Sequence, residues 1–167
     1  MLFELANCSY HHGPILSMDV AIRKSLVVTC GADKFIRIWN FLNMTQEASR
    51  EFAEEIYSVA FHPTGIVAEM QRANHSLLIV SFIPFFIHSG LFLLAGCVDK
   101  IRYLSHVISD IRDLKDWPVR SCKELRFSNG GHLFAAAYGN VLQMYSTTSL
   151  ENVSNMKGHS NKVCLQT

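Results

Sequence analysis

Histidine is the residue type in this chain that most invites a search for chemistry. The eight histidines occupy positions 11, 12, 62, 75, 88, 106, 132 and 159. Zinc sites gather their ligands at close spacings, such as H-x-x-x-H, H-E-x-x-H or paired C-x-x-C motifs. The chain contains none of these spacings, and its five cysteines are scattered. The pair His11-His12 is a weak candidate that a structural role in a turn explains better, so we expect no metal ion and no other cofactor.

Carboxylates offer a second possible chemistry, general acid and base catalysis. Asp110, Asp113 and Asp116 alternate with Arg112 and Lys115. These charges balance one another, so we expect a solvated loop rather than a pair of catalytic carboxylates. The chain also lacks a G-x-S-x-G elbow, a P-loop and a G-x-G-x-x-G turn. Without an acid, a base or a nucleophile in a recognisable arrangement, we predict that the protein is not an enzyme.

Composition narrows the remaining functional classes. The 167 residues are 49% apolar and 17% charged, and the formal net charge of +1 creates no field that would attract nucleic acid. An odd number of scattered cysteines favours reduced thiols in the cytosol over a disulfide framework. The segment MLFELANCSYHHGP has no basic region and no sustained apolar run, so we expect no secretory signal. Trp117 and Tyr57 could anchor a protein partner, although packing at a sheet edge is the simpler expectation.

An internal repeat organises the elements that carry these residues. Residues 20–33 and 127–140 superpose without gaps, and both run thirteen positions from an apolar anchor to an Asp or Asn. Residues 61–99 form a third copy that is 25 residues too long. Removal of residues 66–90 restores the thirteen-position spacing and also a period of 41 residues between copies. The sequence therefore predicts three repeats, the second of them interrupted.

Short apolar and β-branched segments within the repeats predict β-strands. These segments are Ile15–Val20, Leu26–Thr29, Phe35–Trp39, Ile101–Leu104 and Val141–Tyr145. Turn-forming Pro and Gly residues separate them, as in the segments HPTG and SNGG. Many short strands that recur about every 40 residues are typical of the blades of a β-propeller, so we predict an all-β fold.

The first repeat carries a recognisable ending. Residues 30–40, CGADKFIRIWN, resemble the end of a WD repeat, and the segment KGH at 157–159 resembles the Gly-His that opens the next one. In the WD family a buried network joins a histidine, a strand hydroxyl, a turn Asp and a Trp. The resemblance implies a structural blade network at His12, Thr29, Asp33, Trp39, Asp99, Asn140 and His159. His12 precedes its glycine instead of following it, which departs from the family's order.

The later repeats lack much of this network. The second repeat keeps Asp99 but has Ala95 and Leu104 in place of the hydroxyl residue and the Trp. The third repeat has Asn140 and Tyr145 at the turn and Trp positions. We therefore expect these two blades to depend on apolar packing.

Longer stretches of the chain carry a more specific resemblance. The segments HHGPI, SDIRDLKD, RFSNGGHLFAA and TTSLENVSNMKGH resemble the N-terminal propeller of a family of cilia- and flagella-associated WD-repeat proteins, over about residues 10–65 and 91–163. This resemblance implies a non-catalytic scaffold in the ciliary or flagellar axoneme that helps to place dynein arms. Its partners would be axonemal or dynein-associated proteins, without nucleic acid or membrane. The alternative is a general cytosolic WD-repeat scaffold in signalling or ubiquitin ligation.

The apolar stretch at residues 77–98 needs a separate interpretation, because no charged residue occurs between Arg72 and Asp99. A transmembrane helix is one interpretation. However, the repeat uses Leu91–Val98 as a strand, and the fourteen residues that remain are too few to span a bilayer and contain Pro84. A partner-docking insertion is the second interpretation, although the segment has no amphipathic period. We favour the third, a retained intron or a wrong exon boundary.

Together these observations predict an all-β, partial WD-repeat β-propeller of about three blades and the start of a fourth. Residues 1–65 and 91–167 form the incomplete propeller, and residues 66–90 form an aberrant apolar insertion. Blades bury their faces against their neighbours, so we expect terminal blades to expose apolar surface and to need the missing blades as partners. A membrane-anchored fragment is a less favoured alternative.

Overall fold

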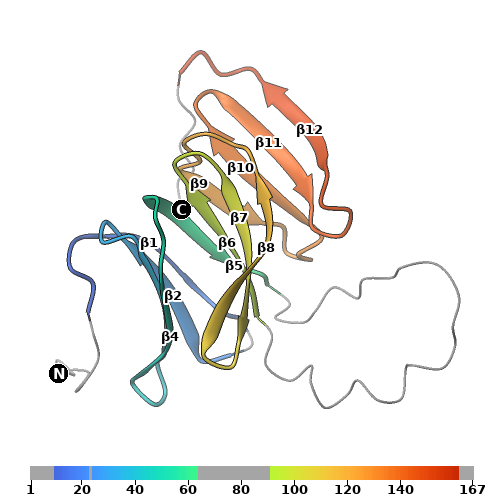
Figure 1. Cartoon of the computed structure of the whole chain (residues 1–167). Helices are drawn as coiled ribbons and strands as arrows, with labels where there is room; N and C mark the ends of the chain where they lie inside the picture. Colours follow the sequence, from blue (N-terminus) through green and yellow to red (C-terminus); the bar gives the residue numbers. More distant parts are fainter. Residues whose placement is uncertain (1–9, 23, 64–90, 162–167) are drawn as a thin grey trace, which may run out of the picture.

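The computed structural model describes residues 10–22, 24–63 and 91–161, which form three antiparallel sheets of four strands (Figure 1). The first sheet has the strand order β1-β2-β3-β4. It contains β1 (Ile15–Val20), β2 (Leu26–Gly31), β3 (Phe35–Asn40) and β4 (Thr45–Glu51). The second sheet contains β5 (Ile56–Phe61), β6 (Leu91–Cys97), β7 (Ile101–Val107) and β8 (Asp110–Trp117) in that order. The third contains β9 (Glu124–Phe127), β10 (Leu133–Tyr138), β11 (Val141–Ser146) and β12 (Asn152–Lys157).

Each sheet is one blade of the predicted propeller, so the all-β prediction is confirmed. The three apolar anchors of the repeat, Val20, Phe61 and Phe127, are the last residues of β1, β5 and β9. These three strands are the first of each blade, and their contacts bring neighbouring blades together. The predicted strands in the repeats lie within strands of the structure, except that β6 ends one residue before Val98. The sequence repeat is therefore also the structural repeat.

The charged segment from Asp110 to Trp117 corrects one expectation. It is not a loop but β8, the fourth strand of the second blade, and it pairs with β7 along its whole length. Only Ile111 and Trp117 are buried in this strand. The fourth strand of a blade has a free edge and exposes most of its side chains, which gives it the composition of a loop.

The strand pairing shows how many additional residues the second repeat contains. Val20 pairs with Val27 in the first blade, and Phe127 pairs with Phe134 in the third, seven positions apart in each case. Phe61 pairs with Leu93, which is 32 positions on and therefore 25 more than in the other blades. Residues 64–90, which include the predicted insertion, lie outside the described residues.

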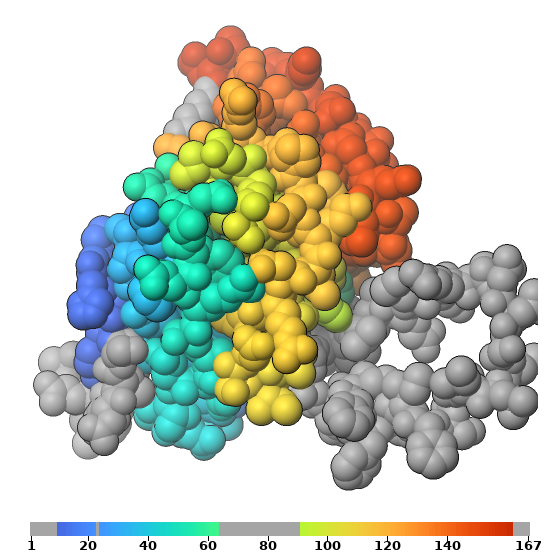
Figure 2. Space-filling model, viewed as in Figure 1, coloured from blue at the N-terminus to red at the C-terminus, as the bar shows by residue number. Residues whose placement is uncertain are grey.

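The core consists of two apolar layers between blades, not within them. One layer joins the first and second blades through residues such as Ile38, Phe52 and Ile56, and the other joins the second and third blades through Trp117 and Phe134. Figure 2 shows the three blades packed side by side in this way. Burial of these side chains between sheets is the main favourable contribution to folding.

Strand β6 explains why the last part of the apolar stretch at residues 77–98 resembles a membrane segment. Leu91, Leu93 and Ala95 belong to the layer shared with the first blade, whereas Leu94 belongs to the layer shared with the third, where Phe92 also packs. Because both faces of β6 are covered, its sequence is a continuous apolar run without alternation. Among the described residues, no helix is long and apolar enough to cross a membrane.

Polar contacts join neighbouring blades on two sides. The inner side is formed by the first strand of each blade and the outer side by the fourth strand. On the inner side, the Ser17 hydroxyl accepts a hydrogen bond from the Val59 N–H at 3.3 Å. The Ser58 hydroxyl accepts one from the Leu125 N–H at 3.2 Å in the equivalent position of the next blade pair. These contacts hold the first strands of successive blades in register.

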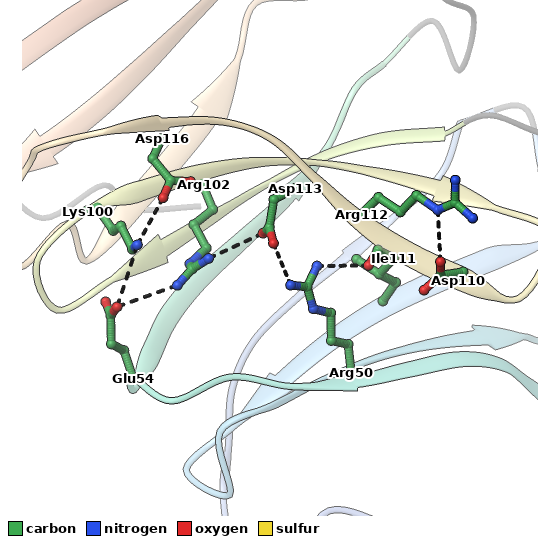
Figure 3. A network of polar contacts seen from close by, with 9 residues as sticks. All are labelled: Arg50, Glu54, Lys100, Arg102, Asp110, Ile111, Arg112, Asp113 and Asp116. Atoms are coloured by element: carbon green, nitrogen blue, oxygen red, sulfur yellow. Dashed lines mark hydrogen bonds and ion pairs between the residues drawn. The ribbon is translucent and has the colours of Figure 1, made fainter.

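On the outer side, an alternating network of charges joins the first and second blades (Figure 3). Arg50 on β4 donates to the Ile111 carbonyl at 2.8 Å and forms an ion pair with Asp113 on β8. Asp113 also contacts Arg102 at 3.3 Å, and Arg102 reaches Glu54 at 3.5 Å. Most of these side chains are partly exposed, so each pair contributes little alone and the network acts mainly to orient the two blades.

His62 forms a further polar contact between the second and third blades. Its Nε2–H donates to the Gly131 carbonyl at 2.9 Å, and the Thr147 hydroxyl donates to the same oxygen at 2.6 Å. Gly131 adopts a φ of +72°, and a Cβ atom built on it would overlap the His62 ring. Glycine is required here both for the backbone conformation and for the close approach of the ring.

We predict that Gly131→Ala destabilises the protein by about 3 kcal/mol, since it adds backbone strain to a steric clash with His62. The matched control is Gly139→Ala, where φ is +54° but a Cβ would meet no atom within 4 Å. That variant should cost only about 1 kcal/mol, from strain alone. Urea unfolding of the two purified variants measures the difference, and equal losses would contradict the role of His62.

Candidate functional site

The polar network of the first blade lies at the turn between β2 and β3. The His11 ring bridges two elements, with Nδ1 at 2.8 Å from Asp33 Oδ1 and Nε2 at 2.8 Å from Thr29 Oγ1. The Trp39 indole N–H donates to the same Thr29 oxygen at 2.8 Å. Thr29 lies in β2, Trp39 in β3 and Asp33 in the turn that joins them. The network therefore ties the segment before β1 to the second and third strands of the blade.

The donors and acceptors assign the protonation of this network. Trp39 can only donate, so the Thr29 oxygen accepts from it and its hydroxyl hydrogen is free to donate onward to His11 Nε2. Because the Asp33 carboxylate can only accept, the ring proton of His11 lies on Nδ1 and is donated to Asp33. Arg37 Nη1 also lies 2.8 Å from this Nδ1, but it directs its hydrogen to Asp33 Oδ2. The network is thus one continuous chain of donors from Trp39 through Thr29 and His11 to Asp33.

Asp33 is the terminal acceptor of this chain and a buried charge. Its side chain is 6% exposed, and Arg37 Nη1 donates to Oδ2 at 2.8 Å. Burial would raise the pKa of Asp33, but hydrogen bonds from His11 and Arg37, and from the backbone N–H groups of His12 and Phe35, outweigh burial and hold that pKa well below its usual range. Asp33 is therefore ionised, and its four donors compensate for the loss of solvent.

The network contains His11, not His12 as the sequence analysis expected. The His12 side chain is exposed, and only its backbone N–H reaches Asp33, at 3.1 Å. Two adjacent histidines point in different directions along an extended segment, and the departure from the Gly-His order moves the functional ring one position towards the N-terminus. Sequence reasoning could not choose between them without the register of this segment.

Sequence reasoning also missed Arg37. The alternation of β3 places Arg37 directly opposite Thr29, on the same face as the network. Its guanidinium lies 4.5 Å above the Phe35 ring and balances the charge of Asp33. An Arg flanked by two Ile residues in a buried strand was the available signal, because a buried Arg needs a nearby carboxylate.

The remaining network candidates are not brought together with these residues. Asp99 is exposed in the turn between β6 and β7, and Asn140 is exposed in the turn between β10 and β11. His159 is exposed beyond the end of β12. Each occupies its place in the repeat, but none lies in a buried network like that of the first blade.

Strand pairing shows what replaces the network in the other blades. Trp39 pairs with Val27, and the equivalent partners are Leu104 with Leu93 and Tyr145 with Phe134. Leu104 and Tyr145 are therefore the structural counterparts of Trp39. By the same register, Ala95 and Ala136 are the counterparts of Thr29, so neither later blade has a hydroxyl at this position.

Aromatic packing occupies this space between the second and third blades. The rings of Phe134 and Tyr145 are stacked with centroids 5.1 Å apart, and Trp117 meets both of them edge-on or tilted. The Trp117 indole N–H donates to the Leu150 carbonyl at 3.2 Å. Trp117 is thus a buried packing residue and not an exposed anchor for a partner.

The residues of the polar network and of the aromatic cluster have structural roles. Among the described residues, no three His, Cys, Asp or Glu side chains gather where they could share a metal ion. The thiols of Cys30, Cys97 and Cys122 are buried, and burial raises their pKa to about 12, 11 and 12. Such thiols stay protonated and are poor nucleophiles.

Known proteins are similar to this chain in its repeats and in the segment that carries the polar network of the first blade. Residues 4–40 match the family described as "WD domain, G-beta repeat". Cilia- and flagella-associated protein 57 of Mus musculus is 40% identical over 161 residues, which are 96% of this chain and 11% of that protein. The chain contains a WD repeat. It is homologous to cilia- and flagella-associated protein 57 over most of its length.

Further comparisons agree with this assignment. Cilia- and flagella-associated protein 57 A of Tetrahymena thermophila is 36% identical over 147 residues, 88% of this chain and 9% of that protein. The chain thus spans about a tenth of the length of these curated relatives. The solved structures "Structure of U3-55K" and "Crystal structure of RRP9 WD40 repeats" each superpose with a TM-score of 0.68 at 13% identity, covering 92% of this chain and 42% of theirs. The chain therefore has the fold of WD40 propeller blades.

We predict that Asp33→Asn destabilises the protein by about 3 kcal/mol at neutral pH, because Arg37 loses its buried counter-ion. The pKa of Asp33 is lowered by folding, so its stabilisation is present above the unfolded value of about 3.9 and is lost as the pH falls. The difference between wild type and variant should therefore shrink between about pH 5 and pH 2, as urea unfolding at several pH values would measure.

The matched control is Asp99→Asn, at the equivalent turn of the second blade, where the carboxylate is exposed. This variant should change stability by no more than about 0.5 kcal/mol at neutral pH, because the side chain is exposed. Equal effects of the two substitutions would show that the first blade owes nothing to its buried network.

Proposed function

We propose that this chain is a non-catalytic WD-repeat scaffold of the ciliary or flagellar axoneme, where it takes part in placing dynein arms. The observation that carries the proposal is the 40% identity to cilia- and flagella-associated protein 57 across 96% of the chain. Two further relatives of the same name, at 36% and 30% identity, support it. The dynein-arm role extends beyond these names and rests on the resemblance of the longer sequence segments.

The geometry of the blades supports a scaffold. Two apolar layers and the polar links at both margins fix the three sheets against one another. The turns between strands then project from the two ends of a rigid stack, where they can contact different proteins at once. Loops on a rigid framework are the usual site of binding in such folds.

The proposed partners are axonemal or dynein-associated proteins and the remaining blades of a propeller. A need for further blades is supported by the exposed apolar side chains on the first and last strands. These are Ile15, Leu16, Met18 and Val20 on β1, and Val153 and Met156 on β12. Each blade covers the face of the next, so these surfaces match a neighbouring blade in the proposed full propeller.

We also propose that residues 66–90 are an insertion into the second blade, with residues 1–65 and 91–167 forming the propeller segment. The 25 additional positions between the paired residues Phe61 and Leu93 support this division. We propose that this insertion derives from a retained intron or a wrong exon boundary.

The location is tested by epitope tagging of the endogenous chain in ciliated cells, followed by detergent extraction of isolated cilia. We expect the tagged chain to remain with the microtubule fraction, while a soluble marker of the ciliary matrix is released. Recovery of the chain only from the cytosol of the cell body would contradict the axonemal assignment and favour a general cytosolic scaffold.

The insertion is tested by long-read sequencing of transcripts from the same cells. We expect most reads to join the codon of Gly65 directly to that of Leu91. If every read contains the 25 intervening codons, and the full chain is soluble and monomeric when expressed, the intron interpretation is wrong.

A further inference from the structure

A groove separates the first and second blades at the end where their third and fourth strands are joined. Its walls are the turn between β3 and β4 and the turn between β7 and β8, which lie side by side at the lower end of the blades (Figures 1 and 2). The groove has a volume of about 610 Å³. Residues that line it include Lys24, Asn40, Leu42, Glu47, His106 and Ile108.

His106 is the unusual feature of this groove. The residue is only 4% exposed, yet neither ring nitrogen makes a hydrogen bond of good geometry to a described residue, and its one polar contact is with the Ile108 backbone. Leaving a buried polar group unpaired is costly, and native structures rarely retain one without a reason. His62, which is also buried, does have a partner of good geometry, the Gly131 carbonyl. His106 therefore lines the groove with hydrogen-bonding capacity that the described chain does not fully use.

Asn40 holds the groove wall in place. Its amide donates to Glu47 at 2.9 Å, and its carbonyl oxygen accepts from the Ser25 hydroxyl at 3.2 Å. The same oxygen accepts from the backbone N–H of Leu42 at 3.1 Å, which shapes the turn between β3 and β4. The wall is thus built before any ligand arrives, which reduces the entropy lost on binding.

The rim of the groove is apolar. Leu42 and Ile108, one from each turn, are both 73% exposed and lie on opposite walls. Phe41, Met44 and Val107 extend the exposed apolar surface along the same two turns. An apolar rim around a few buried polar groups is the usual composition of a site that holds an apolar side chain and orients it through its backbone.

The charges of the groove favour an uncharged ligand. Lys24 and Glu47 supply one charge of each sign, so an acidic ligand would meet Glu47 and a basic one would meet Lys24. Burial lowers the pKa of His106 and Lys24 lowers it further, whereas the nearby Glu47 and the contact with the Ile108 backbone raise it, with a net lowering. A neutral imidazole offers one donor and one acceptor, which matches the C=O and N–H of a peptide backbone.

We propose that this groove binds an extended, uncharged apolar peptide segment of a partner protein, with His106 hydrogen-bonded to the peptide backbone and an apolar side chain held between Leu42 and Ile108. This inference rests on the proposed scaffold function but not on the ciliary location. It names one binding surface and the chemistry of the segment that it recognises.

The first test compares His106→Leu with His62→Leu in the full chain. Leucine removes a poorly paired polar group at position 106, so the melting temperature should stay the same or rise. At position 62 it breaks the contact with Gly131, so the melting temperature should fall by several degrees. A fall of equal size in both variants would show that His106 has an internal partner of good geometry and would overturn the proposal.

The second test titrates the full chain with three blocked tripeptides, in which alanine flanks a central leucine, aspartate or lysine. The ring signals of His106 are followed by NMR, with those of the exposed His132 as the control. We expect saturable shifts of His106 with the leucine peptide and at least tenfold weaker binding of the two charged peptides. His106→Leu should weaken the leucine peptide at least tenfold.

Equal binding of the three peptides, equal shifts of His106 and His132, or no shift at all would overturn the peptide groove. None of these results would remove the scaffold function, because other turns of the blades could bind partners. Conversely, a cytosolic location of the chain would leave the peptide groove intact. The two proposals therefore fail separately.

Discussion

Burial of the sheet faces between neighbouring blades is the constraint on which this structure depends. A four-stranded blade has two broad faces, and the two apolar layers of the chain each form between a pair of blades. The middle blade is therefore covered on both sides, whereas the first and third are covered on one side each. Both the continuous apolar sequence of β6 and the exposed apolar residues of β1 follow from this arrangement.

The blades fill equivalent positions with different types of side-chain contact. In the first blade, a chain of donors from Trp39 to Asp33 fixes the strands, and each member depends on the next. Between the second and third blades, stacked rings such as Phe134 and Tyr145 fill the equivalent space without a polar network. Directional hydrogen bonds define one geometry, whereas apolar packing accepts several residues of suitable volume. The shared strand register makes the two solutions interchangeable within one fold.

The sequence was sufficient for the repeat and the strands, because both depend on local patterns. The anchors at Val20, Phe61 and Phe127 could be aligned without a structure, and each ends the first strand of a blade. The fourth strands were harder to predict, since β8 exposes most of its side chains and carries the charges of a loop. Its strand character comes from pairing with β7, which is a tertiary effect.

The polar site was predictable in part for a similar reason. The resemblance supplied Thr29, Asp33 and Trp39, whose places in the turn and strands follow from the repeat. The choice of His11 over His12 depends on how an extended segment approaches the blade, and the poorly paired His106 depends on a contact between two blades. Neither property is present in a local sequence pattern.

Asn40 has a consequence for how this blade can evolve. A carboxamide donates through one atom and accepts through another, and Asn40 uses its nitrogen towards Glu47 and its oxygen towards Ser25. An aspartate in its place would set two negative charges against each other across the hairpin. Positions 40 and 47 are therefore coupled, because an acid at position 40 would require a hydrogen-bond donor in place of the acid at position 47.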